Sequence, residues 1–230
     1  MIDYNCYVGK WPFHKLTRYT FEQLVGIHKQ NGIEYGYVSS IDSIFYNDFY
    51  ESEKELYETV KNSGYKQVVT VNPAFPSCSL TLERCIGDFD ACGIRLCPGY
   101  HGYDINSQAT DEVMMAAQKY CLPVFITCRM MDERVTHMIH PRLITDSEII
   151  QFIQHYSNVK IILNHLKTNE AFALADVGEN VMMDCTGFTS NFVVKNESIN
   201  KLTQKLVYGS GFPLCNVEAS AFMYKNEIMV

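Results

Sequence analysis

Two histidines of this 230-residue chain stand where a side chain could transfer protons. His165 follows the apolar run Val159 to Leu163, and His101 lies in a Gly-Tyr-His-Gly-Tyr loop after the run Gly93 to Cys97. Histidine titrates near neutral pH and can act as a general acid or base. The glycines and tyrosines beside His101 would also let a ligand approach and stack. We predict catalytic roles for both histidines; the competing interpretations are a hydrogen-bonded core residue for His165 and a surface loop residue for His101.

Two arginines lie at the ends of successive apolar runs. Arg95 is in the run Gly93 to Cys97, and Arg129 directly follows the next run. A guanidinium can hold a carboxylate or a phosphate through two parallel hydrogen bonds. We predict that the two arginines form a clamp for an anionic substrate. The equally weighted alternative is that they form ion pairs, with Asp132, Glu133 or Asp184 as partners.

Other polar and aromatic residues follow the apolar runs and are candidates for contact with the substrate. We predict substrate-binding roles for Asn5, Trp11, Tyr100 and Asp184.

A segment with acids and a base follows Arg129. It contains Asp132, Glu133 and His137, which could form a replacement metal site or a proton-transfer pair. The alternative is a solvated charged loop. The remaining histidines are predicted to lie on helix or loop surfaces without a function: His14, His28, His140 and His155.

Eight short apolar runs are expected to position these side chains. Their consecutive β-branched, aromatic and aliphatic residues are typical of strands buried on both faces of a parallel sheet. Amphipathic patterns predict connecting helices over Thr20 to His28, Glu51 to Val60 and Asp146 to Tyr156, the last with Asp146 as its N-cap. This repetition predicts a single α/β domain over residues 1–230, a (β/α)₈ TIM barrel with its site at the C-terminal ends of the strands. The runs are Met1 to Tyr7, Tyr35 to Ser39, Gln67 to Val71, Gly93 to Cys97, Leu122 to Cys128, Val159 to Leu163, Val181 to Cys185 and Leu206 to Tyr208.

The chain opens with Ile2-Asp3-Tyr4-Asn5-Cys6-Tyr7-Val8-Gly9. This opening is similar to the Ile-Asp-x-His-x-His-x-Gly of the amidohydrolase-related family, which contains metal-dependent TIM-barrel hydrolases and decarboxylases. Later segments resemble that family's strand ends in the right order and over nearly the whole chain: Gly93-Ile94-Arg95-Leu96, Leu122-Pro123-Val124-Phe125-Ile126, Ile161-Ile162-Leu163-Asn164-His165 and Tyr208-Gly209-Ser210-Gly211-Phe212-Pro213. The resemblance implies a barrel fold with hydrolase or lyase activity.

At the family's metal-binding positions this chain departs from the pattern. The resemblance implies two histidines after the first strand, one after the fifth and an aspartate after the eighth, and these positions read Asn5, Tyr7, Thr127 and Gly211. Amides and hydroxyls are poor ligands for zinc and related ions, so we predict no metal and no other cofactor. His165 stands where the family keeps a catalytic histidine. The segment Lys10-Trp11-Pro12-Phe13 also looks like a branch of the family that lacks the usual metal ligands.

The composition of the chain argues against nucleic acids and membranes as partners. Lys and Arg number 19 against 26 Asp and Glu, so the net charge is −7, and without a basic run this argues against nucleic-acid binding. The apolar stretches are too short to span a membrane, and no signal peptide is evident. Nine cysteines without a Cys-x-x-Cys pair indicate buried free thiols in a reducing cytoplasm.

The sequence therefore predicts a cytoplasmic hydrolase or lyase that acts on a small anionic metabolite, with a carboxylate as the expected group. The alternative is a non-catalytic ligand-binding or regulatory protein on the same fold, because a fold does not fix a function. Whether the chain forms a homo-oligomer is left open.

Overall fold

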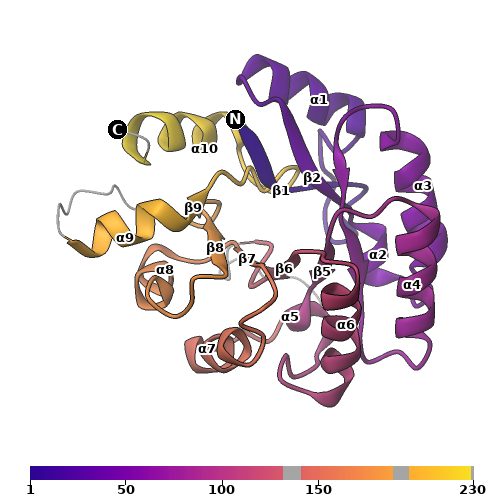
Figure 1. Ribbon diagram of the computed structural model, residues 1–230. Coiled ribbons are helices and arrows are strands. Elements are labelled where there is room, and N and C mark those ends of the chain that lie inside the picture. The colour runs from indigo at the N-terminus through magenta and orange to yellow at the C-terminus, as the bar shows by residue number, and fades with distance from the viewer. Residues whose placement is uncertain (132–140, 189–196, 229–230) are drawn as a thin grey trace.

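The computed structural model describes residues 1–131, 141–188 and 197–228, in which parallel strands alternate with helices (Figure 1). Each of the eight predicted apolar runs contains strand residues. The strands are β1 (Ile2–Val8), β2 (Tyr35–Ser40), β3 (Lys66–Gln67), β4 (Val69–Val71), β5 (Ile94–Leu96), β6 (Val124–Thr127), β7 (Ile161–Asn164), β8 (Val181–Asp184) and β9 (Leu206–Val207).

The run Gln67 to Val71 supplies two strand segments, because its two halves bond to different neighbours. The N–H of Val68 donates to the carbonyl of Val38 at 2.8 Å, whereas the N–H of Val69 donates to the carbonyl of Gly93 at 3.0 Å. β3 therefore pairs with β2, and β4 pairs with β5. The two short strands β3 and β4 together take the place of a single strand in the barrel.

Hydrogen bonds join the strands in order around a ring. The strands β1 to β3 form one parallel sheet and β4 to β9 form a second. The N–H of Tyr4 donates to the carbonyl of Tyr208, and the N–H of Gly211 donates to the carbonyl of Asn5, both at 2.8 Å. These bonds connect the segment after β9 back to β1. The predicted α/β TIM barrel is confirmed for the described residues.

The connecting helices lie around the outside of the strands (Figure 1). Capping boxes begin two of them, with Thr20 paired to Gln23 and Thr145 paired to Glu148. The N-cap of the second is thus Thr145, and the prediction of Asp146 was wrong by one residue, because the threonine hydroxyl accepts the backbone bond. The helices are α1 (Phe21–Gln30), α2 (Asp42–Phe45), α3 (Tyr50–Val60), α4 (Cys78–Asp88), α5 (Pro98–His101), α6 (Gln108–Lys119), α7 (Asp146–His155), α8 (Thr168–Leu174), α9 (Glu197–Lys205), α10 (Val217–Met223) and the π-helix η1 (Tyr224–Ile228).

A cluster of buried apolar side chains lies at the C-terminal ends of the strands, and we call it the mouth cluster. Trp11 is 4% exposed within it, and its ring meets those of Tyr100 and Phe45 edge to face at 5.8 and 5.6 Å between centroids. Edge-to-face packing of this kind stabilises a folded structure. The cluster consists of Tyr7, Trp11, Ile41, Ile44, Cys97 and Met130, with Phe13, Phe45 and Tyr100 packed against it.

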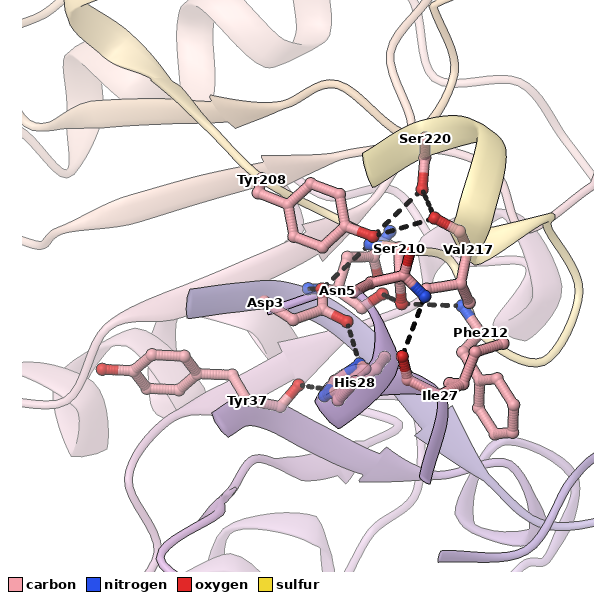
Figure 2. Close-up of polar contacts among 12 residues, drawn as sticks. Asp3, Asn5, Ile27, His28, Tyr37, Tyr208, Ser210, Phe212, Val217 and Ser220 are labelled. Atoms are coloured by element: carbon pink, nitrogen blue, oxygen red, sulfur yellow. Dashed lines mark hydrogen bonds and ion pairs between the residues drawn. The ribbon is translucent and has the colours of Figure 1, made fainter. Parts of the chain in front are cut away.

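Asp3 links β1 to the segment that follows β9 and to helix α1 (Figure 2). Its Oδ1 accepts from the N–H groups of Asn5 and Ser210 at 2.9 Å each, and its Oδ2 lies 3.0 Å from His28 Nε2. The other ring nitrogen of His28 lies 2.9 Å from the hydroxyl of Tyr65. His28 is fully buried, so its predicted surface position was wrong: the side chain is on the inward face of α1.

We expect Asp3→Asn to lower the free energy of unfolding by about 1.5–3 kcal/mol, the range for a hydrogen bond to a charged group. The amide keeps one oxygen for the two backbone donors but replaces the carboxylate oxygen that faces His28. Urea unfolding measures the change. The exposed variant Asp176→Asn controls for the loss of one acidic residue, and equal stability of the two variants would contradict the expected role of Asp3.

All nine cysteines are free thiols and six of them are buried, as expected. The cytoplasmic location stays a prediction. Among the described residues, no helix combines the length and the apolar character that crossing a bilayer requires.

Candidate functional site

Arg95 on β5 is fully buried, and its side chain lies inside the ring of strands. Its Nε donates to Ser39 Oγ of β2 at 2.8 Å. Its Nη1 lies within hydrogen-bond distance of four oxygens from three further strands, so one side chain bridges the barrel interior. These are Asn5 Oδ1 at 3.2 Å, Tyr7 OH at 2.7 Å, Thr127 Oγ1 at 3.0 Å and Asn164 Oδ1 at 3.0 Å.

The hydrogen-bond partners that the structure describes for the Arg95 guanidinium are all uncharged. Its carbon lies 4.4 Å from the ring centroid of Tyr7, which adds a cation–π contact. Its Nη2 is closed off from solvent and has no hydrogen-bond partner among the described residues. No carboxylate in the described ranges forms an ion pair with it. The centre of the barrel therefore holds a positive charge with one nitrogen, Nη2, whose two hydrogens have no acceptor among the described residues.

Glu53 of α3 is a second buried ionisable group, close enough to Arg95 to interact with its charge. Its Oε1 accepts from the N–H of Thr70 at 3.0 Å and its Oε2 accepts from Gln67 Nε2 at 2.8 Å. Burial raises the pKa of Glu53 to about 7, although these hydrogen bonds and the charge of Arg95 oppose the shift. The carboxyl group therefore ionises close to neutral pH.

The raised pKa of Glu53 predicts that stability falls as the pH rises. The folded chain holds the Glu53 proton up to about pH 7 and the unfolded chain releases it near 4.5, so stability is lost between these values. The loss is on the order of 3 kcal/mol. We expect the Glu53→Gln variant to lack this contribution, so that its unfolding free energy varies less with pH than that of wild type. Urea unfolding across pH 4.5–8 measures it, with the exposed variant Glu55→Gln as control. Parallel curves for wild type and Glu53→Gln would contradict the raised pKa.

Asn164 connects Arg95 to Asp184, and Asp184 in turn holds His165. Asn164 Nδ2 donates to Asp184 Oδ2 at 2.9 Å, and the N–H of His165 donates to Asp184 Oδ1 at 2.9 Å. Burial raises the pKa of Asp184, while its hydrogen bonds oppose the shift. His165 is 8% exposed and has a φ of +61°, a left-handed conformation uncommon outside glycine. The hydrogen bond that the His165 N–H donates to Asp184 therefore holds the backbone of the candidate catalytic histidine.

Arg129 forms an ion pair, one of the two interpretations that the sequence left open. Its Nη1 and Nη2 donate to the two carboxylate oxygens of Glu170 on α8 at 2.6 and 2.7 Å, and its Nη1 also donates to the carbonyl of His165 at 3.1 Å. Glu170 is a partner that the sequence did not suggest, and Asp132 and Glu133 lie outside the described residues. Glu170 engages both terminal nitrogens and so holds the Arg129 guanidinium beside the His165 backbone, while the clamp with Arg95 stays a prediction.

His101 lies at the end of α5 and bonds to the backbone. Its Nε2 lies 2.9 Å from the carbonyl of Ile44, so the neutral ring donates from this nitrogen. Burial lowers the pKa of His101 to about 4. Its ring stacks on Tyr103 at 6.2 Å between centroids. His101 is thus neutral near pH 7 and is held beside the mouth cluster.

The structure brings part of the predicted site together. Asn5, Arg95, Asp184 and His165 belong to one connected network through Asn164. The aromatic candidates Trp11 and Tyr100 pack in the mouth cluster instead. The candidates Asp132, Glu133 and His137, and also His140, lie outside the described residues.

Several residues of the network were not predicted as site residues. Ser39, Tyr7, Thr127 and Asn164 supply oxygens to Arg95, and Glu53 interacts with its charge. A polar side chain at or next to the end of an otherwise apolar run could have identified some of them, as it does for Ser39 and Thr127. Glu53 gave no such signal, because its helix carries many acidic residues.

The metal positions implied by the family resemblance do not fit a divalent cation. Asn5, Tyr7 and Thr127 offer neutral oxygens that already lie around Nη1 of Arg95. At Gly211 a Cβ would come within 2.5 Å of a Thr186 methyl carbon, so a carboxylate side chain has no room there. A divalent ion about 4 Å from a guanidinium would also be repelled by roughly 8 kcal/mol at an effective dielectric constant of 20.

One group of potential ligands lies elsewhere among the described residues. Asp3, Cys6 and His28 each place a ligand atom within 4.8 Å of the others. Both nitrogens of His28 already have hydrogen-bond partners, and Cys6 Sγ donates to the carbonyl of Tyr37 at 3.4 Å. Burial raises the pKa of the Cys6 thiol well above its ordinary value, whereas a metal binds the thiolate. These contacts are those of a hydrogen-bonded structural network.

Comparison with known proteins gives one family and a set of related structures. The family model described as amidohydrolase matches residues 61–228. A search of curated proteins gives no match. A protein described as amidohydrolase II is 13% identical, with a TM-score of 0.70, over 100% of this chain and 93% of that chain.

Two further solved structures have named substrates. The 5-carboxyvanillate decarboxylase from Sphingomonas paucimobilis is 10% identical, with a TM-score of 0.66, over 98% of this chain and 92% of that chain. A probable 2-pyrone-4,6-dicarboxylic acid hydrolase from Acinetobacter baumannii, with citric acid bound, is 13% identical, with a TM-score of 0.60, over 96% of this chain and 90% of that chain. Likenesses at this level of identity show the fold alone.

Proposed function

This chain belongs to the amidohydrolase family, and from that membership we propose that it is a hydrolase or lyase that acts on a small carboxylate at the C-terminal ends of the barrel strands. Two structural relatives are named for carboxylate substrates, 5-carboxyvanillate and 2-pyrone-4,6-dicarboxylic acid, and the second structure holds citric acid. These names support the same class of substrate here.

The observation that carries the proposal is the buried guanidinium of Arg95, which no carboxylate among the described residues contacts. All of its hydrogen-bond partners among the described residues are neutral oxygens, and its Nη2 has none. A buried charge without an opposite charge in contact is costly, and a ligand carboxylate would reduce that cost. The donor is closed off from solvent, so a ligand that reaches it has to displace a covering side chain.

His165 is the residue we assign to proton transfer. It follows Asn164, which contacts Arg95, and its own N–H is held by Asp184. We propose that its imidazole faces the bound carboxylate, where a histidine can donate a proton to a leaving group or remove one from water. Asp184 and Arg129 act on the backbone of His165 and are positioning residues.

A non-catalytic ligand-binding role is the second candidate function. It is favoured by the neutral side chains at the metal positions, because the hydrolytic chemistry of a metal-bound water is not available from them. The two functions differ in one respect: both proteins bind the carboxylate, and only the enzyme converts it.

A thermal-shift screen tests the proposal with small mono-, di- and tricarboxylates and their matched amides. A carboxylate at 100 times its Kd should raise the unfolding midpoint by roughly 5–11 °C, and the amide should not. Product formation, followed by chromatography, then separates the enzyme from the binder. Equal shifts by the amides, or no shift by any carboxylate, would count against the substrate class.

A further inference from the structure

The nitrogen Nη1 of Arg95 lies in a cage of oxygens. Four oxygens from β1, β6 and β7 lie 2.7–3.2 Å from it, although a guanidinium nitrogen has only two hydrogens to donate. Two of these oxygens, the hydroxyls of Tyr7 and Thr127, also lie 3.1 Å from each other. The surroundings are therefore those of a cation within a shell of neutral ligands.

Three of the four cage residues, Asn5, Tyr7 and Thr127, stand at positions where the family resemblance implies metal ligands. Their side chains converge on the guanidinium instead. The fourth implied position, Gly211, has no space for a side chain.

We infer that the guanidinium of Arg95 replaces the divalent cation of the family, as a built-in and permanently charged centre that holds β1, β2, β6 and β7 around it. Arginine keeps its charge over the whole accessible pH range, so unlike a bound metal this centre cannot be removed by a chelator. The cage consequently selects a planar guanidinium and rejects zinc or manganese. The inference goes beyond the proposed function, since it concerns the cation and holds whether or not the protein has a substrate.

Chemical rescue tests the inference with stability as the readout. Arg95→Ala removes the guanidinium and leaves the cage oxygens without their donor, so the variant should be less stable than wild type. Methylguanidinium chloride at millimolar concentration should then refill the cage. A tenfold excess over its Kd should raise the unfolding midpoint of Arg95→Ala by roughly 3–6 °C.

Two controls make the rescue specific. Wild type and the exposed variant Arg84→Ala should not be stabilised by methylguanidinium, because neither has an empty cage. Methylammonium, zinc chloride and manganese chloride should not reproduce the rescue of Arg95→Ala. Stabilisation of that variant by zinc or manganese, and not by methylguanidinium, would overturn the inference.

A second measurement covers the case in which Arg95→Ala does not fold. Wild-type protein, incubated with zinc or manganese and then dialysed, should retain far less than one metal ion per chain by elemental analysis, and EDTA should leave its unfolding midpoint unchanged. Retention of about one ion per chain, lost together with stability on addition of EDTA, would overturn the inference.

Discussion

Replacing His165 with asparagine should lower the turnover of the carboxylate substrate by about 10²–10⁴, the usual contribution of a general acid or base. Asparagine is chosen because it tolerates the left-handed conformation that His165 adopts, with a φ of +61°. The backbone bond to Asp184 is therefore expected to survive. Affinity for the substrate should change little, since proton transfer contributes mainly to the transition state.

Single-turnover kinetics and calorimetry on the same preparation separate the two effects. The exposed variant His155→Asn is a matched control and should retain wild-type turnover. Unchanged turnover in His165→Asn would remove the proposed proton-transfer role. A parallel loss of binding and turnover would assign His165 to substrate binding.

Replacing Asp184 with alanine should cost about 3–5 kcal/mol of stability, because three donors lose their acceptor and each buried donor left unsatisfied costs about 1–3 kcal/mol. The N–H groups of His165 and Thr186 and the amide of Asn164 would lose their acceptors. Because these bonds hold the His165 backbone, turnover should fall as well.

The conservative variant Asp184→Asn distinguishes positioning from a direct chemical role. Its oxygen can still accept from the backbone of His165, whereas its amide group meets the amide of Asn164. We expect Asp184→Asn to recover part of the stability and most of the turnover lost in Asp184→Ala. Equal turnover in the two variants would contradict the positioning role.

The strand positions could be predicted because buried parallel strands need consecutive apolar residues. All eight predicted runs contain strand residues, including Val159 to Leu163 and Val181 to Cys185. The break within Gln67 to Val71 could not be predicted, because it depends on which neighbour each half bonds to in the ring. Apolar patterning carries no information on that choice of partner.

Side-chain partners were predicted less well than strands. The sequence singled out Arg95 and Arg129 equally, yet one lies in a cage of neutral oxygens and the other pairs with Glu170, which is 41 residues further along the chain. Such contacts depend on how strands and helices from distant segments meet. His28 shows the same limit, because only the folded ring places Asp3 and Tyr65 on either side of its imidazole.

A crystal structure of the protein with a carboxylate from the thermal-shift screen would show directly whether a carboxylate binds at the buried guanidinium of Arg95. The expected result is a ligand carboxylate oxygen within hydrogen-bond distance of Arg95 Nη2, with the reacting group of the ligand facing His165. A carboxylate bound elsewhere, with Nη2 still enclosed and without a ligand partner, would contradict it.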